Sequence, residues 1–209
     1  MKEDNTNESQ KNTGISRRGF LKGAGLTTAG TVMLQSGLLG KDKETIAAGE
    51  EVGIEGVVIR LKVNGKMHSA LVEPRDTLAY TLREKLGLTG TKVVCDRGSC
   101  SACTVWVDNI PVNSCSTLAL EVGDSEVTTV EGLAKDGKLH PVQEAFIEHD
   151  ASMCGFCTPG MVMSAAHLLE TNKNPSLADV KNATRGNLCR CGTYPHVFKA
   201  TLEAAKKMS

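Results

Sequence analysis

"CDRGSCSACTVWVDNIPVNSC", residues 95–115, decides how the first half of this chain is interpreted. The stretch contains four cysteines: Cys95, Cys100, Cys103 and Cys115. Their spacing, C-x4-C-x2-C followed by a fourth cysteine, is typical of a plant-type [2Fe–2S] cluster loop. Gly98 permits the positive φ that such a loop needs, and the small residues between the thiols let the backbone wrap closely. Zinc sites more often show two C-x2-C pairs, so zinc and disulfides are the less favoured alternatives.

A second group of cysteines lies in "CGFCTPGM" and "NLCRCGTYP": Cys154, Cys157, Cys189 and Cys191. A Cys189–Cys191 disulfide would be strained, and spacing alone leaves a four-cysteine zinc site open. Threonine and proline follow each pair, which predicts that each pair lies at the N-terminus of a helix. Free N–H groups there favour an anion such as an iron–sulfur cluster. We interpret Cys189 and Cys191 as holding one side of a cluster whose other side is held by the earlier pair.

The residues around the first cysteine group predict a small α+β domain over residues 53–132. Asn64-Gly65 between two alternating apolar runs predicts a β-hairpin. Leucines spaced by four predict a helix over residues 76–86, with Asp76 or Thr77 as N-cap. Further strands are expected over 104–107, from the turn at Asp108-Asn109 to Cys115, and in "SEVTTVEGL".

After about residue 135 the pattern changes to helical periodicity. Four segments carry apolar residues at helical spacing: "LHPVQEAFIEHD", "TPGMVMSAAHLLETN", "SLADVKNATRG" and "YPHVFKATLEAAKKM". They predict an all-α second domain over residues 136–209. Met161 and Met163 are expected to fill its core.

The N-terminal residues 1–50 are interpreted as an export signal and linker. "SRRGFLK", residues 16–22, places Arg17 and Arg18 before a weakly apolar run, and so resembles a twin-arginine signal. We therefore expect a periplasmic protein, exported already folded; "TIAAGE", residues 45–50, is the best cleavage candidate. The run is too rich in glycine and threonine for a membrane-spanning helix. An oxidising compartment favours disulfides, but thiolates that already bind metal would be protected.

Composition excludes several classes of function. Net charge is +0 and aromatic residues are 3%, which argues against a nucleic-acid binder. Five histidines invite a Rieske interpretation, but two complete sets of four cysteines make histidine ligands unnecessary. "GLTGTK", which ends at Lys92, lacks the spacing of a phosphate loop, and no dinucleotide motif follows a strand. No catalytic residue stands out, so the chain is expected to carry electrons only.

Together, the plant-type loop, "CGFCTPG" and "NLCRCGTYP" resemble one known family. It is the two-cluster iron–sulfur subunit of the xanthine dehydrogenase/aldehyde oxidoreductase family of molybdenum hydroxylases, and the resemblance covers about residues 55–207. It implies a β-grasp, ferredoxin-like domain followed by a four-helix bundle, each with a [2Fe–2S] cluster. The implied ligands of the first cluster are Cys95, Cys100, Cys103 and Cys115. Those of the second, which lies next to the molybdopterin, are Cys154, Cys157, Cys189 and Cys191.

The resemblance also implies partners. A separate large subunit would bind molybdopterin and hydroxylate an aldehyde or N-heterocycle; electrons would pass from it through both clusters to an acceptor. A FAD subunit, a cytochrome and a quinone are all compatible acceptors, and the substrate cannot be read from this chain. Two departures stand out, since Ser101 replaces the family's usual glycine and Met153 its usual glutamine. Methionine cannot donate a hydrogen bond to the pterin.

Two other interpretations compete with this one. A scaffold with two structural zinc sites would have the same number of cysteines, but it would be colourless where an iron–sulfur protein is red-brown. A free-standing ferredoxin would explain the first domain and leave the helical domain without a purpose.

Overall fold

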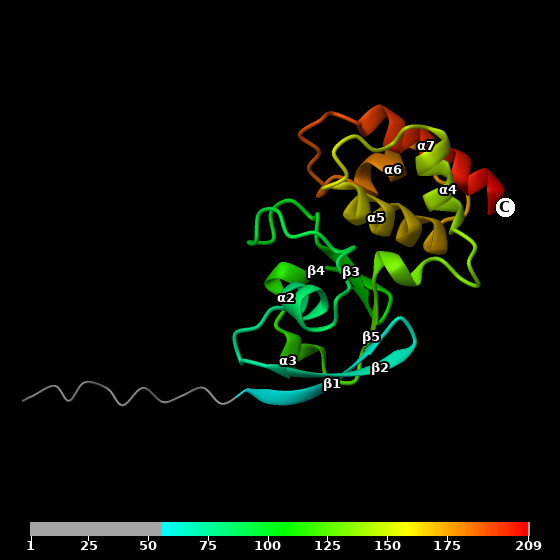
Figure 1. Ribbon diagram of the computed structural model, residues 1–209. Helices are drawn as coiled ribbons and strands as arrows, with labels where there is room; N and C mark the ends of the chain where they lie inside the picture. The colour runs from blue at the N-terminus through cyan, green and yellow to red at the C-terminus, as the bar shows by residue number, and fades with distance from the viewer. Residues whose placement is uncertain (1–55, 209) are drawn as a thin grey trace, which may run out of the picture. The chain divides into compact units, whose positions relative to one another are not determined.

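The computed structural model describes residues 56–208, which belong to one compact unit spanning Gly53–Ser209 (Figure 1). The twin-arginine segment and its cleavage candidate lie outside the described residues. Within residues 56–208, no helix combines the length and apolar character that a bilayer span requires.

The first two strands form the predicted hairpin. β1 (Val57–Val63) pairs antiparallel with β2 (Lys66–Val72) through Asn64 and Gly65. Both turn residues have positive φ, 51° and 75°, as a two-residue hairpin turn of the mirror-image type requires. Alternate side chains are buried, among them Leu61, Val63, Ala70 and Val72.

Three further strands complete a mixed sheet. They are β3 (Thr104–Val107), β4 (Ile110–Asn113) and β5 (Glu126–Thr128). The strand order is β2-β1-β5-β3-β4; β1 and β5 run parallel, while every other pair is antiparallel. This sheet and the helix packed on it give the expected α+β, β-grasp arrangement. Short turns of helix at Ser114–Ser116, Ala119–Val122 (α3) and Val130–Gly132 connect the remaining parts.

The helix of this region differs in part from the prediction. α2 (Leu78–Tyr80) begins after Thr77, whose hydroxyl accepts from the Tyr80 N–H and so confirms it as N-cap. The following turn, Thr81–Lys85, is a π-helix, in which the Leu86 N–H reaches the Thr81 carbonyl, 3.0 Å away. The predicted helix is therefore present, but its second half is wound as a π-helix. Leu78 and Leu82 are still fully buried against the sheet.

Four longer helices form the second region, as predicted. They are α4 (Pro141–Glu148), α5 (Thr158–Thr171), α6 (Leu177–Ala183) and α7 (Tyr194–Lys207). Met161 and Met163 are 1% and 0% exposed, which confirms them as core residues. Figure 1 shows α5 lying closest to the sheet, with α4, α6 and α7 beyond it.

The two regions are packed directly on each other. Trp106 of β3 is buried in the helical core, and its indole N–H donates to the Met163 carbonyl at 3.1 Å. Gly160 of α5 lies against the first cysteine loop, where an added Cβ would come within 2.2 Å of the Ser101 carbonyl oxygen. Only glycine fits such an approach, and it brings the two cysteine groups side by side.

Candidate cluster-binding sites

The first cysteine loop curls through three residues with positive φ. Asp96, Gly98 and Ser101 have φ of 52°, 70° and 51°. Gly98 confirms the sequence argument, and a Cβ there would also lie 2.8 Å from the Ser116 hydroxyl. Ser101 adopts this conformation although it replaces a glycine of the family pattern. Asp96 carried no sequence signal beyond the known tolerance of aspartate for left-handed backbone.

Backbone N–H groups of this loop point at cysteine sulfur. The Gly98 N–H donates to Cys115 Sγ at 3.2 Å, and the Ser99 N–H donates to Cys95 Sγ at 3.4 Å. The Cys115 N–H lies 3.5 Å from Cys103 Sγ. Such donors stabilise negative charge on sulfur. The loop therefore has the donor chemistry that an anionic cluster requires.

The four thiols of this loop differ in burial and in pKa. Burial raises the pKa of the Cys103 thiol to about 11. By contrast, the Arg97 backbone N–H, followed by contact with the Cys100 thiol, lowers the pKa of Cys95 to about 7. Cys95 is half-buried, whereas the other three are buried. The loop thus presents one edge, at Cys95, toward the surface.

The second group lies at two helix N-termini, as predicted. Cys157 is itself the N-cap residue of α5, and Thr193 is that of α7; each helix has a proline in its first turn. Gly155 and Gly192, each directly after a cysteine, have φ of 84° and 81°. Each segment therefore has a glycine with left-handed backbone directly after a cysteine.

The thiols of the second group pair across the two segments. Cys157 lies against Cys189, and Cys154 against Cys191, close enough for the members of each pair to affect each other's pKa. The two segments thus face each other, and the expectation that they hold opposite sides of one cluster stays a prediction. Burial, followed by the Cys189 thiol, raises the pKa of Cys157 to about 12.

The pKa of Cys189 moves in the opposite direction. Burial acts to raise it, but hydrogen bonds from the Thr193 hydroxyl and backbone N–H outweigh burial and lower the pKa to about 7. The Cys189 N–H is occupied elsewhere, since it donates to the Tyr194 phenol oxygen at 2.8 Å.

Both groups therefore present their thiols in pairs: Cys95 with Cys100, Cys103 with Cys115, Cys154 with Cys191, and Cys157 with Cys189. All eight are free thiols. Among residues 56–208, no three His, Cys, Asp or Glu side chains are grouped to hold a single metal ion. A two-iron cluster takes two protein ligands at each iron, and the pairs match that requirement.

The two cysteine groups are linked by short hydrogen bonds. The Leu188 N–H donates to the Cys100 carbonyl at 3.0 Å, and the Asn187 side-chain amide donates to the Ser101 carbonyl at 2.9 Å. Asn187 is 2% exposed. Sequence reasoning missed its role, and its position just before "LCRC" was the only available signal.

Exposed apolar side chains are neighbours in sequence of the second group. Cys154 and Cys191 are exposed, and beside them in sequence Met153, Phe156 and Leu188 are 70%, 59% and 56% exposed. Exposed apolar residues gathered around a site are typical of a protein interface. The ferredoxin-like loop has a smaller example in Val94, which is 55% exposed next to Cys95.

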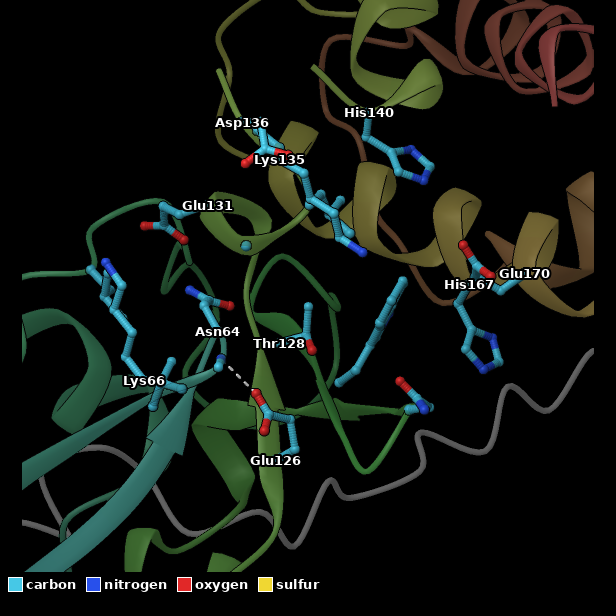
Figure 2. Close-up of a pocket in the computed structure, with 18 of the residues that line it drawn as sticks. Asn64, Lys66, Glu126, Thr128, Glu131, Lys135, Asp136, His140, His167 and Glu170 are labelled. Atoms are coloured by element: carbon cyan, nitrogen blue, oxygen red, sulfur yellow. Dashed lines mark hydrogen bonds between the residues drawn. The ribbon is translucent and has the colours of Figure 1, made fainter. Parts of the chain in front are cut away.

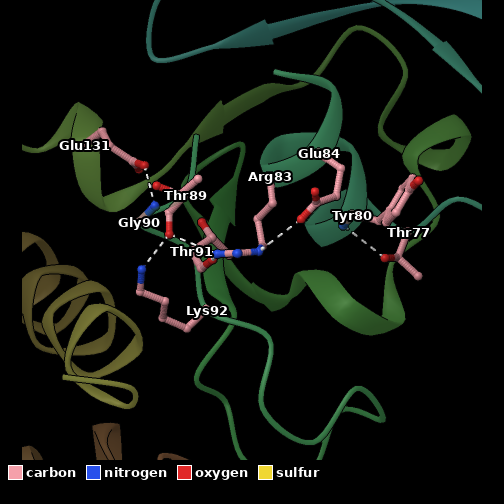
Figure 3. A network of polar contacts seen from close by, with 9 residues as sticks. All are labelled: Thr77, Tyr80, Arg83, Glu84, Thr89, Gly90, Thr91, Lys92 and Glu131. Atoms are coloured by element: carbon pink, nitrogen blue, oxygen red, sulfur yellow. Dashed lines mark hydrogen bonds and ion pairs between the residues drawn. The ribbon is translucent and has the colours of Figure 1, made fainter. Parts of the chain in front are cut away.

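The "GLTGTK" segment, residues 87–92, is held by hydrogen bonds to its own carbonyls and to Arg83 and Glu131. Figure 3 shows the Arg83 guanidinium reaching its carbonyls; one nitrogen donates to Thr89 at 3.0 Å and to Thr91 at 2.8 Å. The Lys92 ammonium donates to the Thr89 carbonyl, and the Gly90 N–H to the Glu131 carboxylate. Both cations are thus satisfied by the segment itself.

A polar cleft of about 1240 Å³ lies between the two regions, and none of the eight cysteines lines it (Figure 2). His140 and His167 line the cleft, but they have other roles. His140 accepts the Val142 N–H as the N-cap of α4, and the His167 ring packs edge-on against Trp106, with centroids 5.9 Å apart. The expectation that these histidines are not cluster ligands agrees with their contacts.

Comparison with known proteins agrees with this geometry. Residues 61–133 match a family described as the 2Fe-2S iron-sulfur cluster binding domain, and residues 129–202 match the [2Fe-2S] binding domain. The chain is 47% identical over 148 residues to the nicotine 6-hydroxylase small subunit of Paenarthrobacter nicotinovorans, covering 71% of this chain and 89% of that one.

Two further similarities extend this result. The PaoA iron-sulfur-binding subunit of Escherichia coli K12 aldehyde oxidoreductase is 36% identical over 206 residues, covering 91% of this chain and 88% of PaoA. The crystal structure of quinoline 2-oxidoreductase from Pseudomonas putida 86 superposes with a TM-score of 0.70 at 42% identity, over 73% of this chain and 95% of that chain.

Proposed function

The chain belongs to the family of iron–sulfur subunits of molybdenum hydroxylases, which transfer electrons within oxidoreductase complexes, and on that premise we propose how its residues serve this role. The ferredoxin-like cluster is held by Cys95, Cys100, Cys103 and Cys115. The helical-region cluster is held by Cys154, Cys157, Cys189 and Cys191. When bound, each cluster supplies a one-electron carrier.

The backbone N–H groups directed at cysteine sulfur, in a region that matches a 2Fe-2S cluster binding domain, are the observation that carries this assignment. The eight thiols form two groups of four, and four cysteines are the ligand set of one [2Fe–2S] cluster. The chain's own part is to hold the thiolates and to direct N–H groups at them, as Gly98 and Ser99 do. Burial of Cys103 and Cys157 keeps water from the inner ligands.

A molybdopterin-binding large subunit is proposed to dock over the second group. The support is the exposed apolar surface of Met153, Phe156 and Leu188 around the exposed Cys154 and Cys191. Methionine at position 153 offers apolar contact but no hydrogen-bond donor. The large subunit's polar groups at this interface would then be met by other donors.

The electron acceptor is proposed to dock at the ferredoxin-like cluster, near the half-buried Cys95 and the exposed Val94. A FAD subunit or a cytochrome would fit this role. Names of the relatives include nicotine, aldehyde and quinoline, which supports an aldehyde or N-heterocycle as substrate of the complex. We further propose twin-arginine export to the periplasm, on the strength of Arg17 and Arg18 in their sequence context.

The test is elemental analysis of the purified chain. Two [2Fe–2S] clusters correspond to about four iron and four acid-labile sulfide per chain. Zinc without sulfide would contradict the proposal and favour a scaffold with structural zinc sites.

A further inference from the structure

Thr193 lies at the start of a helix, but its hydroxyl does not cap that helix. It is the N-cap residue of α7, where a threonine hydroxyl usually accepts a helix N–H. Here the side chain makes no capping hydrogen bond. Instead Thr193 Oγ1 lies 3.1 Å from Cys189 Sγ, and the residue is only 4% exposed. The hydroxyl is therefore directed at sulfur, away from solvent.

The direction of this hydrogen bond follows from the chemistry of the ligand. In a free thiol either atom could donate. A cysteine sulfur that binds iron has lost its proton, so only the Thr193 hydroxyl can then donate. A donor to a negatively charged sulfur makes one of the stronger kinds of hydrogen bond.

We propose that Thr193 tunes the reduction potential of the helical-region cluster through Cys189, an inference that rests on the proposed function. Adding one electron increases the negative charge on the ligand sulfurs. A hydroxyl that donates to Cys189 Sγ stabilises the reduced form more than the oxidised form, so the potential rises. No proton moves in this step, because Thr193 keeps its proton throughout.

The ferredoxin-like loop provides a contrast. Backbone N–H groups donate to sulfur there at 3.2 to 3.5 Å, among them those of Gly98, Ser99 and Cys115. The Ser116 hydroxyl is farther away, 3.7 Å from Cys115 Sγ. In the helical site the donor at 3.1 Å is a side-chain hydroxyl, which a substitution can remove.

Thr158→Val provides a matched control. Thr158 follows the cluster cysteine Cys157 at the start of the other helix, but its hydroxyl donates to Ser152 Oγ at 3.1 Å. The same chemical change there removes no bond to sulfur. Thr193→Val removes the hydroxyl at nearly constant volume, Thr193→Ala removes it with the methyl group, and Thr193→Ser retains it.

The experiment is a redox titration of the full chain in its complex, with the signal of each cluster followed by electron paramagnetic resonance beside iron and sulfide content. In the Val and Ala variants, the equilibrium constant for reducing the helical-region cluster should fall roughly three- to tenfold; tenfold corresponds to about 59 mV for one electron. The ferredoxin-like cluster should keep its wild-type potential in every variant. The helical-region cluster should keep its wild-type potential in Thr193→Ser and Thr158→Val.

The outcomes separate the inference from its premise. A fully loaded Thr193→Val or Thr193→Ala protein with an unchanged potential would overturn the role of Thr193. An equal fall in Thr158→Val would do the same, because it would show a general effect of helix-start substitutions. Absence of iron and sulfide from the wild-type chain would instead contradict the proposed function itself.

Discussion

The side-chain amide of Asn187 donates to the carbonyl oxygen of Ser101 across 86 positions of sequence, at 2.9 Å. This bond joins the loop of the first cysteine group to the segment that leads into Cys189. Ser101 also accepts the Thr104 hydroxyl at 2.8 Å, so its carbonyl ties both groups to the sheet. This carbonyl of a left-handed residue is therefore one of the contacts that fix the two groups relative to each other, beside the Leu188–Cys100 hydrogen bond.

Replacement of Asn187 by alanine should loosen this junction. We expect a loss of about 1–2 kcal/mol in unfolding free energy, because a buried hydrogen bond is removed while Ser101 keeps another partner. The magnetic interaction between the two reduced clusters should weaken at unchanged iron content. Asn182→Ala, on the exposed surface of α6, is the matched control. It should change neither the unfolding free energy nor the magnetic interaction. Wild-type coupling in the Asn187 variant would show that the bond does not set the cluster positions.

Arg83 should be needed to hold the segment of residues 87–92. It donates from one nitrogen to the Thr89 and Thr91 carbonyls. Arg83→Ala should cost about 1–3 kcal/mol in chemical denaturation, because the partly buried Thr91 carbonyl loses a charged donor, whereas the exposed Thr89 carbonyl keeps Lys92. Arg75→Ala is the control, since the Arg75 side chain is 78% exposed and pairs only with Glu73 among the described residues; its effect should stay within about 0.5 kcal/mol. Equal effects would contradict the role assigned to Arg83.

Met153 should lie in the interface with the large subunit. Met153→Gln should be tolerated, whereas Met153→Asp should weaken the complex about tenfold or more, because it would place an unpaired charge at a desolvated surface. Co-purification of the large subunit, measured beside iron content, distinguishes the two. Full assembly of Met153→Asp would place residue 153 in solvent and refute docking over the second group.

The free energy of unfolding should fall at mildly acidic pH because His140 becomes protonated. Burial lowers the pKa of this imidazole, the Glu170 carboxylate acts against that shift, and Lys135 and Lys173 act with it. As pH falls, the unfolded chain therefore binds the proton first, near the ordinary histidine pKa of 6.5. The stability that neutral His140 contributes is present above pH 6.5 and is lost as pH falls below it. His140→Asn keeps an N-cap group that does not titrate. Its unfolding midpoint should change less between pH 7.5 and 6.0 than that of the wild type; an identical change would exclude His140 as the cause.

Export should require the arginine pair. Replacing Arg17 and Arg18 by lysine keeps the charge but removes the twin-arginine signal. The double variant should accumulate in the cytoplasm with its clusters in place, because folding precedes transport. Cell fractionation with iron analysis measures this, and normal periplasmic amounts would refute the signal assignment.

Local chemistry explains what the sequence could predict. The hairpin at Asn64-Gly65, the N-cap at Thr77 and the helix starts after Cys157 and Cys191 each depend on a few neighbouring residues, and all are present. The spacing of the first four cysteines is likewise a property of one loop. Such features need no knowledge of distant partners, so they can be read directly from the chain.

Tertiary structure alone decided the remaining features, because each depends on groups brought together by packing. The pairing of Cys157 with Cys189 depends on how α5 and α7 approach each other, and the Ser101–Asn187 bond on how a loop meets a helical segment. Thr193 is similar, since a threonine at a helix start predicts a cap. Whether its hydroxyl bonds to the helix or to sulfur is determined by where Cys189 lies once the chain is folded.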